Sequence, residues 1–415
     1  MAGDRSKINV VSLERPPGQG QQAVAISDEL LARARELVPV LKERAQQAEE
    51  MRRCPERTIE DYLRTGLTRV CQPARYGGYE LGWDVLCEIS QVLAAACGSQ
   101  AWIQRIFADH SHMLATFSAQ AQEDVWGKDH ATCLAASFDP VGRARPVDGG
   151  FMFSGRHGFS SGIDYASWLI CGGYTVENER LDGPHFWLVP KSDATVLDDW
   201  HTMGLEGTGS KSFVVADKFV PAHRFLDGRM ARAGGGPGTA VNTAPIYRLP
   251  KGGGLTATGF AALAVGMARG VLEEWLAYTG TRKSRGSPVS AQQSVQITAA
   301  QSAAEIDAAE ALYLGSIRAA MRKLEHGEPV TDSDLALAKR NVAFACQLVL
   351  TAGTRLFNTA GGRALFKPNP LQRQYRNLLA AVSHHAVVWD QAASEFGAAL
   401  LAKYGAPGAQ NPDVD

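Results

Sequence analysis

The sequence lacks the short motifs that mark several common classes of enzyme. No GxGxxG follows a predicted strand and opens a helix, so nicotinamide binding through a Rossmann fold is not expected. GxxxxGK[ST] and HExxH are absent as well, which argues against a phosphate-loop NTPase and a zinc protease. If the chain takes part in nicotinamide-driven chemistry, another protein must bind the nicotinamide.

Paired cysteines and unbalanced charge are also missing. The seven cysteines are scattered and form no CxxC or Cys/His cluster, which argues against a disulfide framework or a zinc site and predicts buried thiols in a cytoplasmic protein. The 42 Lys and Arg nearly balance the 43 Asp and Glu, and no long run of one sign occurs, so neither nucleic acid nor a membrane is the expected partner. A small molecule is expected instead.

The pattern of apolar residues changes along the chain and predicts a mainly α protein with a middle β domain. Residues 1–24 are polar, without the apolar core of a signal peptide, which predicts a disordered lead-in. Apolar residues at helical spacing predict an N-terminal helical domain over 25–130. Short β-rich runs between turn residues predict a compact antiparallel β domain over 131–235. Long Ala-rich helical patterns predict a helical bundle over 250–405.

Two further features concern packing and access. Alanine and glycine are spread through the helical parts, which indicates close helix packing rather than disorder. The Gly-rich connection between the β domain and the bundle, residues 233–254, is longer than a simple connector, and its composition suits a lid.

The segment from Phe153 to Gly162 places small hydroxyl residues and glycines around an aromatic residue. Phe159 is followed directly by Ser160 and Ser161. Such a strand edge can lie flat against a planar ring system and offer backbone N–H and serine O–H donors to its heteroatoms, which suits a flavin. A β-hairpin with a Ser-Gly turn is the alternative explanation of the same residues.

Four segments occur in the order and at the separations that are typical of one protein family. They are Gly98-Ser99-Gln100-Ala101-Trp102 with His110, Ala135-Ala136-Ser137-Phe138-Asp139-Pro140 with the Phe159 strand, Gly204-Leu205-Glu206-Gly207-Thr208-Gly209-Ser210, and Pro370-Leu371-Gln372-Arg373-Gln374-Tyr375-Arg376-Asn377 with His384. On these segments the chain resembles the acyl-CoA dehydrogenase superfamily over residues 25–405. Within it the chain is similar to the two-component flavin-dependent monooxygenases, such as the p-hydroxyphenylacetate and secosteroid phenol hydroxylases and the dibenzothiophene monooxygenases.

The resemblance implies the acyl-CoA dehydrogenase fold, with an N-terminal helical domain, a β-barrel-like middle domain and a C-terminal four-helix bundle, assembled as a homotetramer. It also implies an oxygenase component that inserts one oxygen atom from O2 into an aromatic or otherwise electron-rich small molecule through a C4a-hydroperoxyflavin. A separate NAD(P)H:flavin reductase would supply the reduced FMN or FAD. The sequence does not decide between the two flavins.

The resemblance also implies two residues that contact the substrate. In the phenol-hydroxylating members a histidine and a serine at the matching positions contact the substrate hydroxyl. His110 is therefore expected to deprotonate the phenol, and Ser137 to be its hydrogen-bond partner. His112 is the rival base, but the helical spacing from Trp102 favours His110.

A third catalytic candidate lies near the C-terminal end of the bundle. His384 stands close to the position where the dehydrogenases carry their catalytic glutamate, and an imidazole with a pKa near 6.5 could donate a hydrogen bond to the flavin peroxide. If the helix continues from Arg373 through Asn377, His384 lies on the same face and His385 points away. His384 is therefore preferred to His385.

The predicted cofactor contacts come from all three parts of the chain: Trp102, Phe159, Ser160, Ser161, Arg282 and Arg373. Arg282 matches the arginine of an RxxFG element that reaches the flavin pyrophosphate in dehydrogenases, often across a subunit boundary. Arg285 replaces the usual phenylalanine of that element, and Asn377 replaces the usual aspartate after Arg376. The consequences of both departures are left open.

Three alternatives remain at this point. An oxygenase acting on nitrogen or sulfur would not need a phenol base. An acyl-CoA dehydrogenase is disfavoured because its catalytic glutamate is missing, although some branches place that residue on another helix. A non-catalytic binding or assembly protein could keep the same fold, but the joint presence of His110, Ser137, Ser161 and His384 argues against it.

Overall fold

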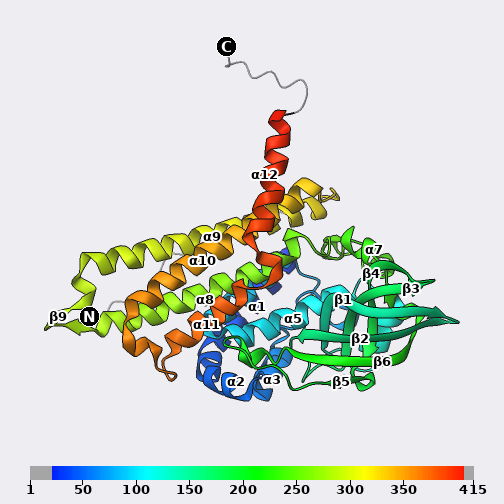
Figure 1. Cartoon of the computed structure of the whole chain (residues 1–415), viewed down its shortest axis with the longest axis horizontal. Helices are drawn as coiled ribbons and strands as arrows, with labels where there is room; N and C mark the ends of the chain where they lie inside the picture. Colours follow the sequence, from blue (N-terminus) through cyan, green and yellow to red (C-terminus); the bar gives the residue numbers. More distant parts are fainter. Residues whose placement is uncertain (1–20, 406–415) are drawn as a thin grey trace, which may run out of the picture.

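The computed structural model describes residues 21–405, and its first part is helical (Figure 1). The elements of this part are α1 (Gln21–Glu43), α2 (Ala45–Met51), α3 (Glu56–Thr65), η1 (Ala74–Tyr76), α4 (Trp83–Ala96), α5 (Gly98–Leu114) and α6 (Ala119–Trp126). Helix α1 begins at Gln21, so residues 21–24 are helical and the lead-in was predicted too long. The rest of that predicted lead-in lies outside the described residues.

Helix α5 is the most enclosed element of this part. Every one of its residues except Asp109 is buried. A surface helix would show a polar stripe to solvent, whereas α5 is packed between α4, α8 and strand β1. The polar side chains of α5 must therefore find partners inside the protein.

The middle part is one seven-stranded sheet in the order β5-β6-β2-β1-β3-β4-β7. Its elements are β1 (Leu134–Val147), β2 (Gly150–Ser160), β3 (Trp168–Glu177), β4 (Arg180–Pro190), η2 (Lys191–Asp193), β5 (Ala194–Val196), η3 (Glu206–Thr208), β6 (Lys211–Pro221), η4 (Ala222–Arg224) and β7 (Phe225–Leu226). The predicted antiparallel pairing is wrong for one pair, because β1 and β3 run parallel. Strand β2 folds back onto one edge of β1, and the chain then crosses to the other edge before β3 begins.

The C-terminal part is a bundle of long helices. After α7 (Gly228–Arg232), η5 (Pro237–Ala240) and η6 (Pro245–Arg248) come α8 (Gly254–Thr281), β8 (Lys283–Ser284), β9 (Ser287–Pro288), η7 (Val289–Ala291), α9 (Gln293–Glu325), α10 (Asp332–Ala360), η8 (Gly362–Leu365), α11 (Pro370–Val382), η9 (His385–Val387) and α12 (Trp389–Gly405). Helix α8 packs against α9, α10 and α11, which makes a four-helix bundle. Helix α12 leaves the body of the molecule (Figure 1).

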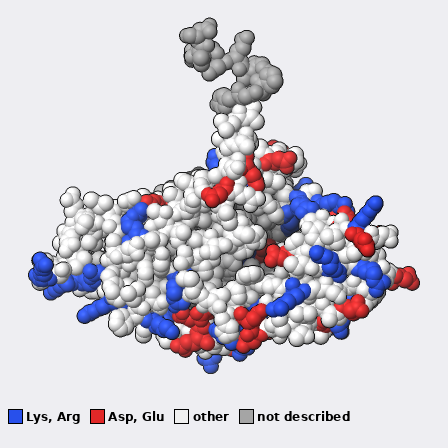
Figure 2. All heavy atoms as spheres, viewed as in Figure 1, with Lys and Arg blue, Asp and Glu red and all other residues white. Residues whose placement is uncertain are grey.

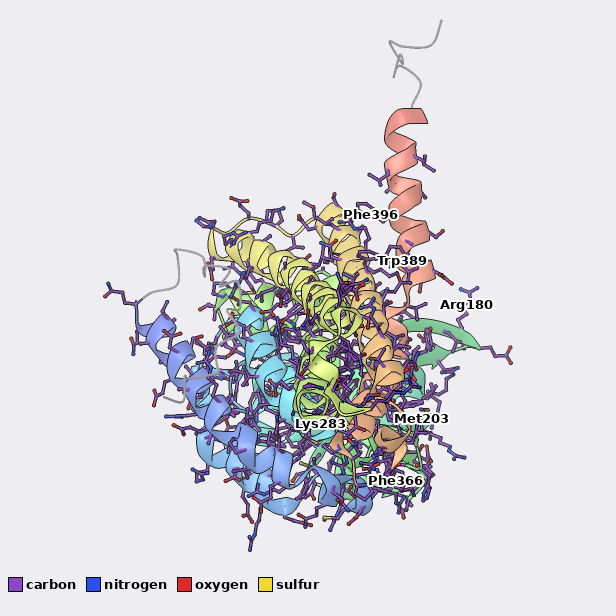
Figure 3. All side chains as sticks on the ribbon, turned by 90° about the vertical axis from the view of Figure 1, so that its left-hand side faces the viewer. Arg180, Met203, Lys283, Phe366, Trp389 and Phe396 are labelled. Carbon is purple, nitrogen blue, oxygen red and sulfur yellow. The ribbon has the colours of Figure 1, made fainter. Side chains whose placement is uncertain are left out.

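Aromatic contacts attach the base of α12 to α10. The Trp389 ring lies 5.3 Å from Phe344, and the Arg340 guanidinium lies 4.3 Å from the centre of the Phe396 ring. Figure 3 shows Trp389 and Phe396 on the lower half of α12, where it leaves the bundle.

Glycines of α8 allow the close helix packing that the composition predicted. A Cβ on Gly266 would lie 2.3 Å from the Gln91 carbonyl oxygen, and one on Gly270 would lie 2.5 Å from that of Ala95. Both distances are far shorter than van der Waals contact, so α4 and α8 approach each other at backbone distance only because these positions lack a side chain.

Within residues 21–405, two helices are long and apolar enough to cross a membrane by length and composition alone, namely α8 and α10. The most apolar window of α8 is 83% buried inside this chain, and that of α10 is 39% buried. The core helix of a bundle passes the same test, so this is weak evidence for a membrane span. Within one copy of the chain, Leu337 and Phe344 of α10 leave 38% and 40% of their surface exposed.

The connection before α8 is anchored and does not form the lid that its length suggested. The Asn242 amide donates to the Ala115 carbonyl oxygen, and Tyr247 is fully buried. Gly236 packs so closely on Thr116 that a Cβ would lie 2.3 Å from its carbonyl oxygen. This connection thus covers the C-terminal end of α5 as a fixed part of the core. All seven cysteines are buried and unpaired, as predicted.

Candidate active site

Helix α5 and the end of strand β2 meet at a side-chain hydrogen bond. The Trp102 indole donates from Nε1 to the Ser161 hydroxyl at 3.1 Å. The same indole lies 5.2 Å from the ring of Phe260 on α8, measured between ring centres. Trp102 therefore joins all three parts of the chain, and two of the predicted cofactor-binding residues are in direct contact.

The backbone at Phe159 is strained, and its side chain is exposed. Phe159 has a φ of 57° and leaves 73% of its surface accessible. A non-glycine residue in the left-handed region costs on the order of 1–3 kcal/mol and tends to persist at functional sites. The neighbouring Ser160 hydroxyl is buried without a hydrogen-bond partner among the described residues. The exposed Phe159 ring close to the Ser161 hydroxyl fits the edge of a planar, heteroatom-rich group such as a flavin, whereas the Ser160 hydroxyl is enclosed in the protein and its contact with flavin stays a prediction.

A chain of hydroxyl groups supports Ser161 from behind. Its Oγ lies 2.7 Å from Ser210 Oγ, which lies 2.6 Å from Thr208 Oγ1. Thr208 in turn donates to the Leu205 carbonyl oxygen at 2.7 Å. The segment 204–210, identified by its sequence, therefore braces the predicted flavin-binding strand.

Asn377 holds this segment against helix α11. Its Oδ1 accepts a hydrogen bond from the Leu205 backbone N–H at 2.7 Å, and Leu205 has a φ of 56°. Asn377, which stands where the family usually has an aspartate, therefore still provides a hydrogen-bond acceptor for the Leu205 N–H. Gly204 permits the contact, because a Cβ there would lie 2.2 Å from the Arg376 carbonyl oxygen.

His110 is buried on α5 with a defined tautomer. Its Nδ1 lies 2.8 Å from the Leu134 carbonyl oxygen. A carbonyl can only accept, so Nδ1 carries the proton and Nε2 keeps a free lone pair. Burial lowers the pKa of His110, which keeps the imidazole neutral. His110 therefore presents a hydrogen-bond acceptor, as the predicted base must.

Ser137 is buried on β1, and the structure shows no hydrogen bond between it and His110. The Phe138 ring lies 5.7 Å from the His110 ring, and residues alternate between the two sides of a strand. Ser137 should then share the side of Ala135, which packs inside the β domain, rather than that of Ala136. Its hydroxyl has no partner among the described residues, and its pairing with His110 stays a prediction.

The rival base His112 faces away from β1. Its Nε2 lies 2.8 Å from the Ile246 carbonyl oxygen, and its ring stacks on Tyr247. Burial and the neighbouring Lys251 lower the pKa of His112 well below its ordinary value. His112 thus belongs to the core beneath the 233–254 connection.

His384 lies beyond the end of α11 and not on its helical face, because the helix ends at Val382. Its Nδ1 accepts the Ala386 backbone N–H at 3.2 Å, so in the neutral ring Nε2 carries the proton. Burial, reinforced by the charges of His385 and Arg105, lowers the pKa of His384 to about 3. The expected value near 6.5 was wrong, and His384 is a neutral hydrogen-bond donor. His385 is exposed, and its ring stacks on that of His384 at 4.5 Å between ring centres.

Phe260 is held between two of these groups. The His384 ring stacks on it at 4.0 Å, and the Arg105 guanidinium lies 4.1 Å from its centre. The His384 ring and the Arg105 guanidinium are both so close to the centre of the Phe260 ring that they cannot fit on the same face. They therefore lie on opposite faces of Phe260. Phe260 is therefore a fixed wall between α5 and the end of α11.

Arg105 was not among the predicted site residues. It is 1% exposed, and its Nη2 lies 3.0 Å from Asp109 and donates to the Thr256 carbonyl oxygen at 3.2 Å. Its Nε and Nη1 have no partner among the described residues. A charged residue one turn after Trp102, between the apolar residues Ile103 and Ile106, was the signal that could have revealed it.

Arg373 is tied to helix α2 rather than left free for a phosphate. Its Nε donates to Glu49 at 2.7 Å, and Arg376 binds the same carboxylate. Burial alone would raise the pKa of Glu49, but the two arginines outweigh it and hold that pKa below its ordinary value. Arg373 thus clamps α11 to α2, and its predicted contact with flavin stays a prediction.

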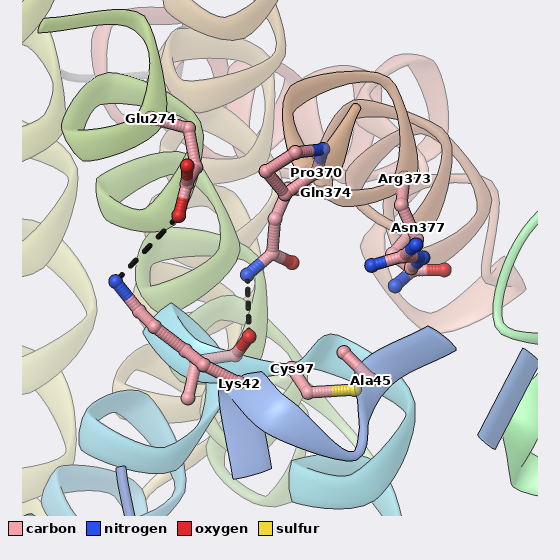
Figure 4. Close-up of a pocket in the computed structure, with 9 residues that line it drawn as sticks. Lys42, Ala45, Cys97, Glu274, Pro370, Arg373, Gln374 and Asn377 are labelled. Carbon is pink, nitrogen blue, oxygen red and sulfur yellow. Dashed lines mark hydrogen bonds and ion pairs between the residues drawn. The ribbon is translucent and has the colours of Figure 1, made fainter. Parts of the chain in front are cut away.

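A small cavity beside Arg373 is too small for a cofactor (Figure 4). Its volume is about 30 Å³, room for a water molecule or two. It is lined by Lys42, Ala45, Ala96, Cys97, Glu274, Pro370, Arg373, Gln374 and Asn377. None of the catalytic candidates faces it.

Arg282 lies far from these residues within one copy of the chain. It caps α8 and donates to the Ala360 carbonyl oxygen at 2.7 Å. The helical rise from Phe260 to Arg282 is about 33 Å, and Figure 1 places this end of α8 opposite the β domain. If Arg282 binds the phosphate of a flavin at Ser161, it does so from another copy or at the distant end of the nucleotide.

The hydrogen bond of Asn377 can be tested by substitution. In Asn377→Leu the buried Leu205 N–H loses its acceptor, which should lower the free energy of unfolding by about 1–3 kcal/mol. Asn377→Asp retains an acceptor and serves as the control. Chemical denaturation and the hydrogen exchange of the Leu205 amide measure the effect. Equal stability and exchange in the two variants would show that this bond does not hold the segment.

Comparisons with known proteins agree with this architecture. The bundle matches the family model described as acyl-CoA dehydrogenase, C-terminal domain, over residues 258–389. The chain is 35% identical over 358 residues to the flavin-dependent monooxygenase oxygenase subunit HsaA of Rhodococcus jostii, covering 84% of this chain and 92% of that protein. It is 31% identical over 384 residues to the FADH2-dependent resorcinol hydroxylase oxygenase component of a Rhizobium species, covering 90% and 94%.

A solved structure extends the similarity to three dimensions. The crystal structure of the HsaA monooxygenase from Mycobacterium tuberculosis superposes with a TM-score of 0.86 at 32% identity, covering 90% of this chain and 97% of that one. The mainly α fold with a middle β domain is thereby confirmed, and the relatives named here are oxygenase components of flavin-dependent enzymes. The chain belongs to the acyl-CoA dehydrogenase superfamily, in its branch of flavin-dependent monooxygenase oxygenase subunits.

Proposed function

We propose that this chain hydroxylates a small aromatic compound with O2 and a reduced flavin supplied by a separate reductase. The observation that carries the proposal is a pair of neutral histidines with opposite tautomers. His110 offers a lone pair at Nε2, and His384 offers an N–H at Nε2. The His384 ring lies 6.1 Å from Trp102, and His110 lies about 12 Å along α5 from Trp102.

Residues at the end of β2 would hold the flavin. Phe159 would cover the ring, and the Ser161 hydroxyl would meet one of its heteroatoms. The bound reduced flavin supplies the two electrons that let O2 deliver one oxygen atom to the substrate and the other to water. The apolar side chains of Trp102 and Phe260 exclude bulk water, which would otherwise favour release of H2O2.

His110 would prepare the substrate. Its lowered pKa keeps Nε2 unprotonated at neutral pH, and the bond from Nδ1 to Leu134 holds the ring in place. A phenol that donates its proton to Nε2 becomes more electron-rich on the ring, which promotes attack on the activated oxygen. A substrate oxidised at nitrogen or sulfur would not need this step.

Substitution of His110 should separate oxygen activation from hydroxylation. His110→Ala should slow product formation by about 100-fold or more, the usual effect of losing a general base, while the reduced flavin is still oxidised. Product by chromatography and H2O2 by a peroxidase-coupled assay give the two rates. The exposed His326→Ala, at the C-terminal end of α9, is the control. Unchanged hydroxylation in His110→Ala would exclude the base role and favour the nitrogen or sulfur oxygenase.

His384 would donate a hydrogen bond to the activated oxygen. The Ala386 N–H fixes its Nδ1 as an acceptor, so its donor is always Nε2–H. Because its pKa is about 3, the ring remains neutral throughout the physiological range. This donor cannot give up its proton to the site as an imidazolium would.

Loss of that donor should divert oxygen to H2O2. His384→Ala should raise the share of reduced flavin that ends as H2O2, and the difference from wild type should stay constant from about pH 5.5 to 8.5, where an ordinary histidine would titrate. The ratio of H2O2 to hydroxylated product measures it. A difference that vanishes below pH 6.5, or no difference at all, would contradict the assigned role.

We also propose that the chain works as a cytoplasmic homotetramer assembled through its bundle. Seven unpaired thiols suit a reducing compartment. A groove of about 210 Å³ between α9 and α10 is lined by Ala311, Leu312, Gly315, Ser316, Ala319, Ala320, Asp334, Leu337 and Asn341. Figure 2 shows few charged side chains on the bundle face turned to the viewer. Such a surface can receive a helix of a second copy.

The assembly can be tested by adding charge to the groove between α9 and α10. Ala319→Arg should yield smaller species than wild type in light scattering, because a buried unpaired charge at an interface is costly. The exposed Ala216→Arg on β6 serves as the matched control. A tetramer that persists in Ala319→Arg would place the interface elsewhere, and a wild-type monomer would refute the assembly.

A further inference from the structure

We infer that the hydroxyl chain behind Ser161 makes its oxygen a hydrogen-bond acceptor only, so that the site selects reduced flavin over oxidised flavin. Ser210 and Thr208 are then positioning residues that act on the flavin through Ser161. The inference rests on the proposed placement of the flavin beside Ser161. It goes further by assigning a direction to each proton in the chain.

The direction is set at the end of the chain that lies farthest from the flavin. Thr208 Oγ1 is 2.7 Å from the Leu205 carbonyl oxygen, which can only accept, so the single hydroxyl proton of Thr208 lies between them. Thr208 is 2.6 Å from Ser210, and the proton between these oxygens must therefore come from Ser210. Ser210 is 2.7 Å from Ser161, so the proton there must come from Ser161.

The Ser161 hydroxyl also accepts a hydrogen bond from outside the hydroxyl chain. The indole N–H of Trp102 can only donate, and it occupies one lone pair of Ser161 Oγ. The Ser161 proton points to Ser210. One lone pair remains, and Ser161 can offer nothing else to a bound ring. The serine O–H donor that the sequence suggested at this strand edge is thus used inside the protein.

An acceptor in this place distinguishes the two oxidation states of an isoalloxazine ring. Reduction by two electrons adds a proton at N5, so the reduced ring has an N5–H donor where the oxidised ring has a lone pair. The remaining lone pair of Ser161 Oγ accepts a hydrogen bond from the N5–H of the reduced ring and repels the N5 lone pair of the oxidised ring. An oxygenase that receives reduced flavin from a reductase and must release the oxidised product gains from that difference.

The anchor of the chain explains how the direction is maintained. The Leu205 carbonyl oxygen accepts from Thr208, and the Leu205 N–H is held by Asn377 on α11. The proton order is therefore imposed by a backbone group that cannot rotate. A hydroxyl chain that ended in water could reverse its direction.

The test compares the affinities of the two flavin forms. The full-length protein is titrated with FMN and, under anaerobic conditions, with dithionite-reduced FMN, and both titrations are repeated with FAD. The quantity of interest is the oxidised-to-reduced ratio of dissociation constants, which wild type should show well above one. Ser210→Ala frees the Ser161 proton to turn toward N5, so this ratio should fall about tenfold, which is about 30 mV in the two-electron potential of the bound flavin.

Conservative substitutions separate the proton order from mere packing. Ser210→Thr keeps the hydroxyl and should restore the wild-type ratio. Thr208→Val should lower the ratio as Ser210→Ala does, and Thr208→Ser should not, which gives a second route if Ser210→Ala folds poorly. Thr202→Ala removes a hydroxyl from the neighbouring loop, bonded to the Gly204 carbonyl oxygen at 2.9 Å, and is the matched control.

The outcomes divide clearly. The inference is supported if Ser210→Ala and Thr208→Val lower both the oxidised-to-reduced ratio and the potential of the bound flavin. Ser210→Thr, Thr208→Ser and Thr202→Ala should keep the wild-type values. The same ratio in all variants overturns it, provided that Ser161→Ala still weakens flavin binding and so leaves the proposed site intact. If Ser161→Ala changes neither affinity, the flavin does not lie beside Ser161, and both the inference and the proposed site are wrong.

Discussion

The nearly complete enclosure of α5 is the constraint on which the rest of the site depends. A buried polar group costs free energy unless it has a partner, and α5 carries polar side chains along its whole length. Ser111 bonds within the helix, but most of the others reach another element, and their hydrogen bonds connect the three parts of the chain. Trp102 binds Ser161 at the end of β2, Arg105 binds the backbone of α8, and His110 binds the backbone of β1.

The same enclosure decides the chemistry of the histidines. In water an imidazole exchanges protons and tautomers freely, whereas burial suppresses the charged form and a backbone partner selects one nitrogen. At His110 the partner is a carbonyl, and at His384 it is an N–H. Nε2 of His110 is therefore a hydrogen-bond acceptor, and Nε2 of His384 is a donor. Neither nitrogen choice could be seen in the sequence, because Leu134 and Ala386 contribute only backbone atoms.

The sequence predicted the fold and the main site segments for a physical reason. The four matching segments are the ones that touch: Trp102 meets Ser161, Ser161 meets Ser210, and Leu205 meets Asn377. What failed depended on long-range packing. The parallel pairing of β1 and β3 depends on a crossover, and the 233–254 segment looked like a lid because its anchors on α5 lie over a hundred residues earlier.

The hydrogen-bond path from Trp102 to Asn377 passes through the N-terminal helices, the β domain and the bundle, and α11 is clamped back onto α2 by Glu49. The Ser161 oxygen is thus positioned by all three parts at once. No single part carries the recognition surface, so the chain offers no transferable binding module. Recombination that exchanged the β domain alone would also have to replace its partners on α5 and α11, which ties the evolution of the three parts together.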